Sequence, residues 1–369
     1  MKLRVGITGQ NGFIGYHTMQ QLRLFPEKYE IIPFEKEYFN NPAGLQQFVK
    51  SCDAVIHLAA MNRGDEKAIY ATNISLVKKL IEAMETAEAA PHILFSSSTQ
   101  ETRGNLYGNS KKEGAGLFAA WAEKNHAVFS HFVIPNVFGP FSRPYYNTVV
   151  ATFCHQLTHN ETPRVDVDAS MNLSYVGDLA KEFIAHLHDE TSAVISPQPV
   201  AEISVSGLLA KLEEFKAWYF EKGMIPSLLT RFDINLFNTF RSFANDIMPI
   251  YPELHSDPRG TFVEVMKEMT GGQTSFSTTV PGITRGNHYH LRKIERFCVV
   301  KGKALIQTRR VGIDIVNEYE VSGEKPVCID MPIYYTHNIK NIGDEELLTI
   351  FWINELFDPN DPDTYFEAV

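Results

Sequence analysis

Four side chains near the C-terminal end of this 369-residue chain have the types and spacing of metal ligands. His288 and His290 lie two residues apart, so in a strand they point to the same face, and later residues join them if the strands curl into a small barrel. Imidazole and carboxylate suit zinc, nickel, manganese or iron, and availability makes zinc the first expectation. The sequence therefore predicts one divalent metal, with these ligands: His288, His290, Glu295 and His337.

Residues around these ligands extend the pattern. Gly282 precedes the histidine pair, and Gly302 follows the glutamate. The arrangement resembles both sequence patterns of the cupin superfamily, which implies an all-β barrel around a metal. One position departs from the family, because Pro332 is followed by Ile and Tyr334 where Pro-x-Gly is usual. Tyr334 would place a bulky phenol near the pocket, which calls the usual turn geometry there into question.

A second reactive group lies in the N-terminal half. Ser98 lies in a run of serines at the end of a predicted strand, Tyr107 comes nine residues later, and Lys111 follows Tyr107 by four. Residues four apart share a helical face, so the Lys111 ammonium can lower the pKa of the Tyr107 phenol and hold a cofactor ribose. The phenol can then donate a proton to a carbonyl as hydride arrives. This spacing predicts a carbonyl reductase site.

The start of the chain supplies the binding loop that such a reductase needs. An apolar strand at residues 2–8 leads into Gly9, Gly12 and Gly15, which open an amphipathic segment. This order presents backbone N–H groups and a helix dipole to a pyrophosphate. Further strands alternate with helical patterns, which predicts a parallel, doubly wound α/β sheet of the Rossmann type. We expect those strands at residues 30–34, 54–59 and 92–98.

The N-terminal motifs together resemble the extended short-chain dehydrogenase/reductases (SDRs). The match includes the glycine loop, the Ser98/Tyr107/Lys111 triad and the runs 57–60 and 135–139. The resemblance implies that Ser98, Tyr107 and Lys111 are catalytic and that Asn136 binds substrate. It also implies a set of residues that bind the cofactor: Thr8, Gly9, Gly12, Phe13, Ile14, Gly15, Leu58, Ala59, Asn73 and Lys111.

The choice between NAD and NADP is left open by the second strand. It ends in Phe34, Glu35 and Lys36. An acidic residue there favours the ribose hydroxyls of NAD, whereas a basic residue favours the 2′-phosphate of NADP. We expect NADPH through the resemblance of the whole chain described below.

Length, charge and composition bound the remaining possibilities. A chain of 369 residues exceeds what one core usually supports, so we expect two domains. A net charge of −10 argues against nucleic acid as a partner. We see no signal peptide and no uninterrupted apolar span, so we expect no membrane insertion and a soluble, cytoplasmic protein. The cysteines share no metal or redox spacing, and we expect them reduced and buried: Cys52, Cys154, Cys298 and Cys328.

The composition and the hydrophobic periodicity of the sequence change near residue 244. Helical patterns at 203–219 and 228–243 give way to several prolines and then to alternating strands with glycine-rich turns. We therefore expect an NAD(P)-binding SDR reductase domain at 1–244 and a cupin metal-binding epimerase domain at 245–369.

The second domain opens with a run at 257–264 that is similar to the opening motif of cupin-fold sugar-nucleotide epimerases. That similarity implies that Arg259 and Glu264 bind the substrate nucleotide, although a structural salt bridge is the alternative. Reductase followed by cupin, across the whole length, resembles a family of bifunctional capsular-polysaccharide enzymes. The resemblance implies a homodimer that epimerises a UDP-linked 4-keto-6-deoxy-N-acetylhexosamine at C3 and reduces C4 with NADPH, towards UDP-N-acetyl-L-fucosamine.

The predicted chemistry leaves several alternatives open. A metal near the 4-keto group would help a base remove the C3 proton. The base is one of four candidates: Tyr289, Tyr334, Tyr335 or His255. Four protein ligands would fill a tetrahedral zinc site, so the coordination expands, one candidate is not a ligand, or the metal is structural. Two rival functions remain, a reductase whose cupin is only a metal-stabilised dimerisation module, and a non-catalytic NADP-binding regulator.

Overall fold

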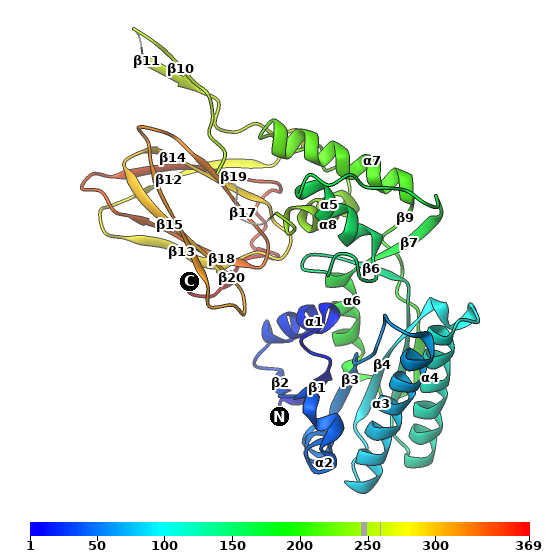
Figure 1. Ribbon diagram of the computed structural model, residues 1–369. Helices are drawn as coiled ribbons and strands as arrows, with labels where there is room; N and C mark the ends of the chain where they lie inside the picture. The colour runs from blue at the N-terminus through cyan, green and yellow to red at the C-terminus, as the bar shows by residue number, and fades with distance from the viewer. Residues whose placement is uncertain (245–248, 259) are drawn as a thin grey trace. The chain divides into compact units, whose positions relative to one another are not determined.

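A computed structural model describes residues 1–244, 249–258 and 260–369, and the chain divides into two compact units (Figure 1). The first unit comprises Met1–Thr152 and Val167–Val205, and the second comprises Phe153–Asp166 and Ser206–Val369. The predicted fold class is confirmed, with a Rossmann-type parallel sheet in the first unit and an antiparallel, cupin-like β structure in the second. Each unit is described by itself.

The first unit is built on a six-stranded sheet in the order β2-β1-β3-β4-β5-β8, with every neighbouring pair parallel. The expected strands are present, although the second and third are shorter than predicted. Both faces of the central strands are buried, as their continuous apolar runs require. The strands are β1 (Leu3–Thr8), β2 (Tyr29–Ile32), β3 (Ala54–His57), β4 (His92–Ser98), β5 (Phe129–Ile134) and β8 (Ala193–Ile195).

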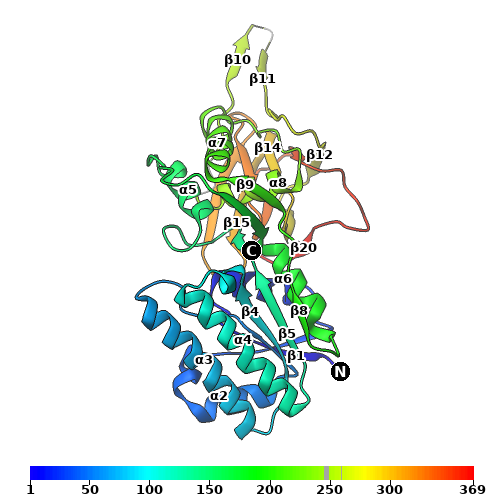
Figure 2. The same ribbon diagram turned by 90° about the vertical axis from the view of Figure 1, so that its right-hand side faces the viewer.

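Helices cover both faces of this sheet (Figure 2). One core joins α2 (Pro42–Ser51), α3 (Glu66–Thr86) and α4 (Leu106–Asn125) to strand residues such as Val55, and the other joins α1 and α6 to residues such as Ile56. Consecutive residues of a strand therefore point to opposite faces of the sheet and pack into different cores. The other elements of the first unit are α1 (Phe13–Arg23), η1 (Lys36–Asn40), η2 (Thr99–Thr102), β6 (Asn136–Phe138), β7 (Ser170–Tyr175), α6 (Val176–Ala185), η3 (His186–His188) and β9 (Ala201–Ser204), and α5 (Val149–Thr158) runs from the first unit into the second.

Two antiparallel sheets form the body of the second unit, in the orders β12-β19-β14-β17 and β16-β15-β18-β13-β20. Apolar residues from both sheets share one core, including Val299, Ile306, Ile329 and Ile339. The strands are β12 (Gln273–Thr279), β13 (Thr284–Tyr289), β14 (Glu295–Lys301), β15 (Lys303–Arg310), β16 (Val316–Ser322), β17 (Cys328–Met331), β18 (Tyr335–Asn341), β19 (Leu347–Ile353) and β20 (Tyr365–Phe366), with an exposed hairpin of β10 (Leu254–Asp257) and β11 (Gly260–Val263) before them.

Helical segments precede the barrel in this unit. They are α7 (Val205–Phe215), a π-helical turn η4 (Lys216–Glu221) and α8 (Arg231–Arg241). Both expected helices are present, and the first ends early because its last turns widen into the π-helix. A capping box between Thr230 and Asp233 begins α8.

A buried polar network joins these helices to the barrel. Arg296 of β14 binds Asp330 of β17 and donates through Nη1 to the carbonyl oxygen of Gly223 at 2.9 Å. From α8, Arg241 donates to the carbonyl oxygen of Met331 at 3.2 Å. The segment at 206–243 therefore makes its contacts within the second unit, and the boundary near residue 244 stays a prediction.

Two further expectations concern the state of the cysteines and the presence of membrane-spanning helices. All four cysteines are free and buried, as predicted. Among the described residues, none of the helices combines the length and the apolar character that crossing a bilayer requires.

Candidate functional site

The four predicted metal ligands lie together in the barrel. His288 is in β13 and is the direct cross-strand partner of His337 in β18, while His290 follows β13. Glu295 is the first residue of β14. One nitrogen or oxygen from each residue lies within 4.8 Å of the others. The structure thus brings into one cluster residues that are up to 49 positions apart in the sequence, 288 and 337.

Hydrogen bonds orient two of the imidazoles toward the carboxylate. His290 places Nδ1 2.5 Å from the carbonyl oxygen of Asp363 and Nε2 3.1 Å from Oε2 of Glu295. His337 places Nδ1 3.1 Å from the carbonyl oxygen of Tyr335 and Nε2 3.2 Å from the same Oε2. An Nδ1–H donated to a carbonyl leaves Nε2 as the nitrogen that faces the cluster.

The donor set fits a divalent cation. Nε2 of His337 is buried and, among the described residues, has no aligned hydrogen-bond partner. A buried polar atom of this kind is costly unless a partner such as a metal ion satisfies it. Three imidazoles and one carboxylate would give a divalent ion four ligands from the protein.

The charges of the cluster follow from burial and proximity. Burial alone would raise the pKa of Glu295, but the His290 hydrogen bond and the neighbouring His337 hold that pKa below its usual value. Burial and the other two histidines lower the pKa of His288 to about 4. The pKa of His290 is raised, because its hydrogen bond to Glu295 outweighs burial. At neutral pH the cluster therefore holds an ionised carboxylate and a neutral His288.

Tyr334 lies in a left-handed turn beside these ligands. Its φ is +61°, its side chain is 1% exposed, and its amide donates to the carbonyl oxygen of His290 at 2.8 Å. Glycine adopts this conformation easily and tyrosine does not. The turn geometry that the bulk of Tyr334 called into question therefore keeps a glycine-type φ, because the tyrosine adopts the conformation that glycine would favour.

The four predicted bases lie in different surroundings. Tyr289 alternates with His288 and His290 along the strand, so its side chain points to the opposite face, where its ring lies 5.5 Å from that of Tyr365. His255 is exposed on the β10–β11 hairpin. Tyr334 and Tyr335 border the turn before His337. This arrangement argues against Tyr289 and leaves the other three.

The predicted reductase triad lies at the carboxyl end of β4 and the start of α4. Ser98 ends β4 and accepts a hydrogen bond from the amide of Gln100 at 3.2 Å. Tyr107 is in the first turn of α4, which Asn105 caps. One turn later, Nζ of Lys111 lies 5.9 Å from the centre of the Tyr107 ring. The helical spacing predicted for Tyr107 and Lys111 is confirmed.

Burial controls the pKa values of this pair. It raises the pKa of Tyr107 to about 12 and lowers the pKa of Lys111 to about 8. The expected lowering of the tyrosine pKa by Lys111 is therefore wrong in this structure, because desolvation dominates and the ammonium donates to the carbonyl oxygen of Ser96 at 2.7 Å. Tyr107 is fully protonated at neutral pH, as a proton donor must be.

The glycine loop has the close backbone packing of a nucleotide-binding turn. Gly9 has φ +77°, and a Cβ there would lie 2.9 Å from the amide nitrogen of Ala59. A Cβ on Gly15 would lie 2.3 Å from the carbonyl oxygen of Gly9. Gly12 precedes the first turn of α1, so the amides of Phe13 and the following Ile14 begin a helix with no capping side chain. Backbone donors at such a helix start suit a pyrophosphate.

Thr8 and Asn73 hold neighbouring parts of this region. The hydroxyl of Thr8 lies 2.7 Å from Nδ1 of His57 and accepts from the amide of Ala59 at 3.3 Å, which fixes the loop with Leu58 after β3. Asn73 bonds both backbone groups of Met61 and the hydroxyl of Ser110. Asn73 therefore ties this loop to α4, and its contact with a cofactor stays a prediction.

Two of the three predicted substrate-binding residues are among the described residues. Asn136 is exposed in β6. Glu264 is exposed and pairs with Lys267 at 2.7 Å, which lowers its pKa. Arg259 lies outside the described residues. Their roles toward substrate stay predictions.

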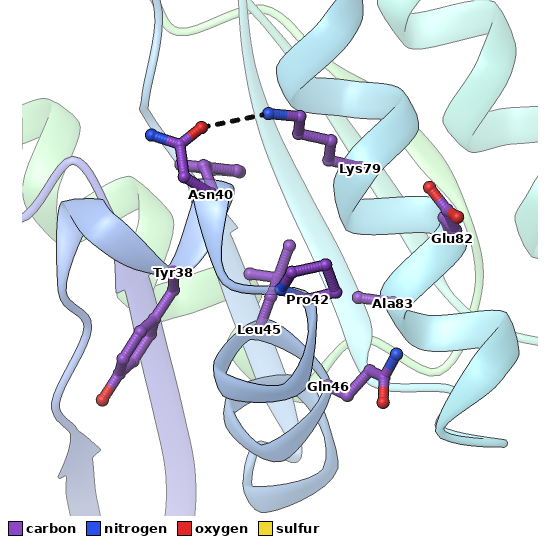
Figure 3. Close-up of a pocket in the computed structure, with 9 residues that line it drawn as sticks. Tyr38, Asn40, Pro42, Leu45, Gln46, Lys79, Glu82 and Ala83 are labelled. Carbon is purple, nitrogen blue, oxygen red and sulfur yellow. Dashed lines mark hydrogen bonds between the residues drawn. The ribbon is translucent and has the colours of Figure 1, made fainter.

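Two hollows lie beside β2's connection to α2. One, of about 620 Å³, is lined by Lys36, Thr72, Ser75 and Lys79 among others. The other, of about 280 Å³, has an apolar floor that includes Pro42, Leu45 and Ala83, and Lys79 donates to Asn40 across its rim at 3.3 Å (Figure 3). The larger hollow places two ammonium groups near the end of the second strand.

Sequence reasoning missed two residues beside the metal cluster. Asp363 is 2% exposed and binds the loop between His290 and Glu295. Lys293 is 3% exposed within that loop. Asp363 belongs to the closing run of the chain, but its separation of 72 residues from Leu291 gave no local signal of this contact.

Comparisons with known proteins agree with this geometry. Residues 5–195 match the NAD dependent epimerase/dehydratase family, and residues 255–365 match the polysaccharide biosynthesis C-terminal domain. A UDP-2-acetamido-2,6-beta-L-arabino-hexul-4-ose reductase of Pseudomonas aeruginosa is 35% identical, with 98% of each chain covered. The crystal structure of the capsular polysaccharide assembling protein CapF from Staphylococcus aureus is 33% identical over 100% of both chains, with a TM-score of 0.63. RMD from Pseudomonas aeruginosa, solved with NADPH, covers 58% of this chain and 82% of its own at 20% identity and a TM-score of 0.52, so it shows a shared fold only.

Proposed function

Because this chain belongs to the NAD-dependent epimerase/dehydratase family, we propose that it carries out two consecutive reactions on one sugar nucleotide. The second unit inverts C3 of a UDP-linked 4-keto-6-deoxy-N-acetylhexosamine, and the first unit reduces the C4 ketone with NADPH. The product is UDP-2-acetamido-2,6-dideoxy-L-talose, a precursor of UDP-N-acetyl-L-fucosamine for capsule or O-antigen. One observation carries the proposal: a single chain holds both the His288/His290/Glu295/His337 cluster and the Tyr107/Lys111 pair.

Inversion at C3 depends on the acidity of a hydrogen next to a ketone. The barrel cluster would hold a divalent ion, with zinc the first expectation, since Glu295 is ionised and His288 is neutral at neutral pH. Such an ion would supply positive charge that stabilises the negative charge developing when the C3 proton is removed. A base among Tyr334, Tyr335 and His255 removes the proton, and protonation of the opposite face inverts C3.

Reduction at C4 uses the residues of the first unit. NADPH supplies the hydride. The amides at the start of α1 bind its pyrophosphate, and Ser98 donates a hydrogen bond to the ketone oxygen. Tyr107 donates a proton to the same oxygen as charge develops there. Its raised pKa keeps the phenol protonated before the reaction, and Lys111 holds the cofactor ribose.

The larger hollow supports NADPH over NADH. Lys36 follows the end of β2, and Lys79 of α3 lines the same space. Two ammonium groups favour the extra 2′-phosphate of NADPH. Glu37 also lines the hollow and would oppose that phosphate, so the proposal predicts that the lysines dominate.

Mass spectrometry of the 4-keto sugar in D₂O tests the proposal. Without NADPH, the protein is expected to introduce one deuterium at C3. With NADPH, it is expected to give a reduced product that carries the same deuterium. Reduction without deuterium would favour the rival in which the cupin is only a dimerisation module. Binding of NADPH with neither reaction would favour the regulator.

A further inference from the structure

We propose that Asp363 is a positioning residue for the metal cluster, which it serves by fixing the backbone and ring orientation of His290; this inference rests on the proposed metal site. Asp363 lies 73 residues from His290, in the segment between β19 and β20. Its carbonyl oxygen is 2.5 Å from Nδ1 of His290. That contact selects the tautomer with the proton on Nδ1, so Nε2 is the nitrogen offered to a cation.

The side chain of Asp363 fixes the loop that follows His290. Oδ1 accepts from the amide of Leu291 at 3.1 Å, and Oδ2 accepts from the amides of Arg292 and Lys293 at 3.0 and 2.9 Å. Three consecutive amides around one carboxylate form an anion-binding nest. Because the bonds are charge-assisted and Asp363 is 2% exposed, water competes little for them.

Side chains of this loop, residues 291–294, also bind the C-terminal segment between β19 and β20 that contains Asp363. The guanidinium of Arg292 binds both carboxylate oxygens of Glu355, at 3.2 and 3.1 Å, and pairs with Asp361 at 3.0 Å. Nζ of Lys293 donates to the carbonyl oxygen of Pro362 at 2.5 Å. The loop is therefore held on its backbone and on its side chains by one segment.

This loop separates two ligands, so its shape sets their distance. Four residues lie between His290 and Glu295, and the last of them, Ile294, donates its amide to Oδ1 of Asn354 at 2.8 Å. Asp363 thus controls the start of the loop while Asn354 controls its end. Loss of outer residues that orient a ligand commonly weakens metal affinity about 10–100-fold.

The test is zinc affinity of the full-length Asp363→Asn variant, measured by competition with a chelator. Asparagine keeps the size of the side chain and tolerates the positive φ of +40°. Its amide, however, presents N–H groups to a backbone N–H, so at least one clamp bond is lost. We expect zinc to bind about 10–100-fold more weakly than in the wild type.

Glu268→Gln is the matched control. Oε2 of Glu268 accepts from the amides of Thr270 and Gly271 at 2.7 and 2.6 Å, so this glutamate is also a carboxylate clamp in the second unit. The control is expected to bind zinc as the wild type does, even if both variants lose thermal stability without metal. Wild-type affinity in Asp363→Asn would overturn the proposal. Equal weakening of zinc binding in the control would overturn the specific role of Asp363. No zinc binding by the wild type would instead overturn the metal site itself.

A measurement on the wild type covers the case in which Asp363→Asn does not fold. Long-range proton–nitrogen NMR of the zinc-loaded protein is expected to show His290 protonated on Nδ1. A zinc bond through Nδ1 of His290 would overturn the inference, because the carbonyl of Asp363 could not then receive that proton.

Discussion

Arg296 and Asp330 form a buried, two-point ion pair between neighbouring strands of the barrel, with Nε and Nη2 at 2.6 and 2.9 Å from the two carboxylate oxygens. Each side chain is 2% exposed. Arg296 directly follows Glu295, so it points to the opposite face of β14 and holds the strand from outside the metal cluster. The pair raises the pKa of the guanidinium and holds the pKa of Asp330 below its usual value, despite a burial that works against both charges.

Asp330→Asn is expected to destabilise the second unit by about 3–5 kcal/mol, because it leaves a buried guanidinium without its counter-charge. Denaturation by urea would be followed through tryptophan fluorescence, since Trp218 and Trp352 both lie in this unit. The double variant Arg296→Met/Asp330→Leu removes both charges and should lose less stability than the single variant. A single variant within about 1 kcal/mol of the wild type would contradict the role of the pair.

Tyr334→Gly sets two effects against each other. Glycine relieves the left-handed strain, worth about 1–2 kcal/mol. It also removes a fully buried aromatic side chain, which costs about 3–5 kcal/mol in related large-to-small changes. The lost packing should outweigh the relieved strain, so the free energy of unfolding is expected to fall by about 2–3 kcal/mol. A stabilised variant, measured by the same denaturation, would show that the strain outweighs the packing.

His57 gives the first unit a pH-dependent stability. Burial lowers its pKa to about 3, with Lys111 adding to the effect. Unfolded imidazole binds a proton below about pH 6.5. Acid therefore favours the unfolded chain, and this residue alone costs up to about 1.4 kcal/mol for each pH unit between 6.5 and 3. His57→Gln should flatten the fall in stability between pH 6 and 5, and an unchanged slope would remove His57 as a source.

His290→Ala is expected to lose most of the bound metal. The variant removes one of four ligands and leaves the carboxylate of Glu295 without its hydrogen-bonded partner. Elemental analysis of protein purified without chelators would measure the metal content. His188→Ala is the control, since His188 is exposed in the first unit. Full metal content in His290→Ala would exclude His290 as a ligand.

Local spacing was enough to predict one residue pair in each cluster, whereas Glu295 and His337 joined the metal set through the resemblance to the cupin pattern. Tyr107 and Lys111 share a helical turn, and His288 and His290 share a strand face, so the period of the element brings each pair together. The glycine loop was predicted for the same reason, because its glycines are a few residues apart.

What the sequence could not predict depends on contacts between distant segments. Asp363 meets a loop 70–72 residues away, and Arg241 meets Met331 90 residues away. The contacts of 206–243 with the barrel depend on such pairs and not on composition. The direction of the Tyr107 pKa shift could not be predicted either, because burial, which the sequence does not state, raises that pKa.

One measurement tests most directly the claim that two reactions occur at two clusters. Tyr107→Phe and His290→Ala would each be incubated with the 4-keto sugar in D₂O, and deuterium at C3 would be followed alongside oxidation of NADPH. Tyr107→Phe is expected to keep deuterium uptake and to lose about 10²–10⁴-fold in NADPH oxidation. His290→Ala should lose uptake but still reduce a ketone already inverted at C3. The account is contradicted if Tyr107→Phe also loses deuterium uptake, or if His290→Ala fails to reduce the ketone already inverted at C3. It is also contradicted if Tyr107→Phe oxidises NADPH within about tenfold of the wild type, about 1.4 kcal/mol.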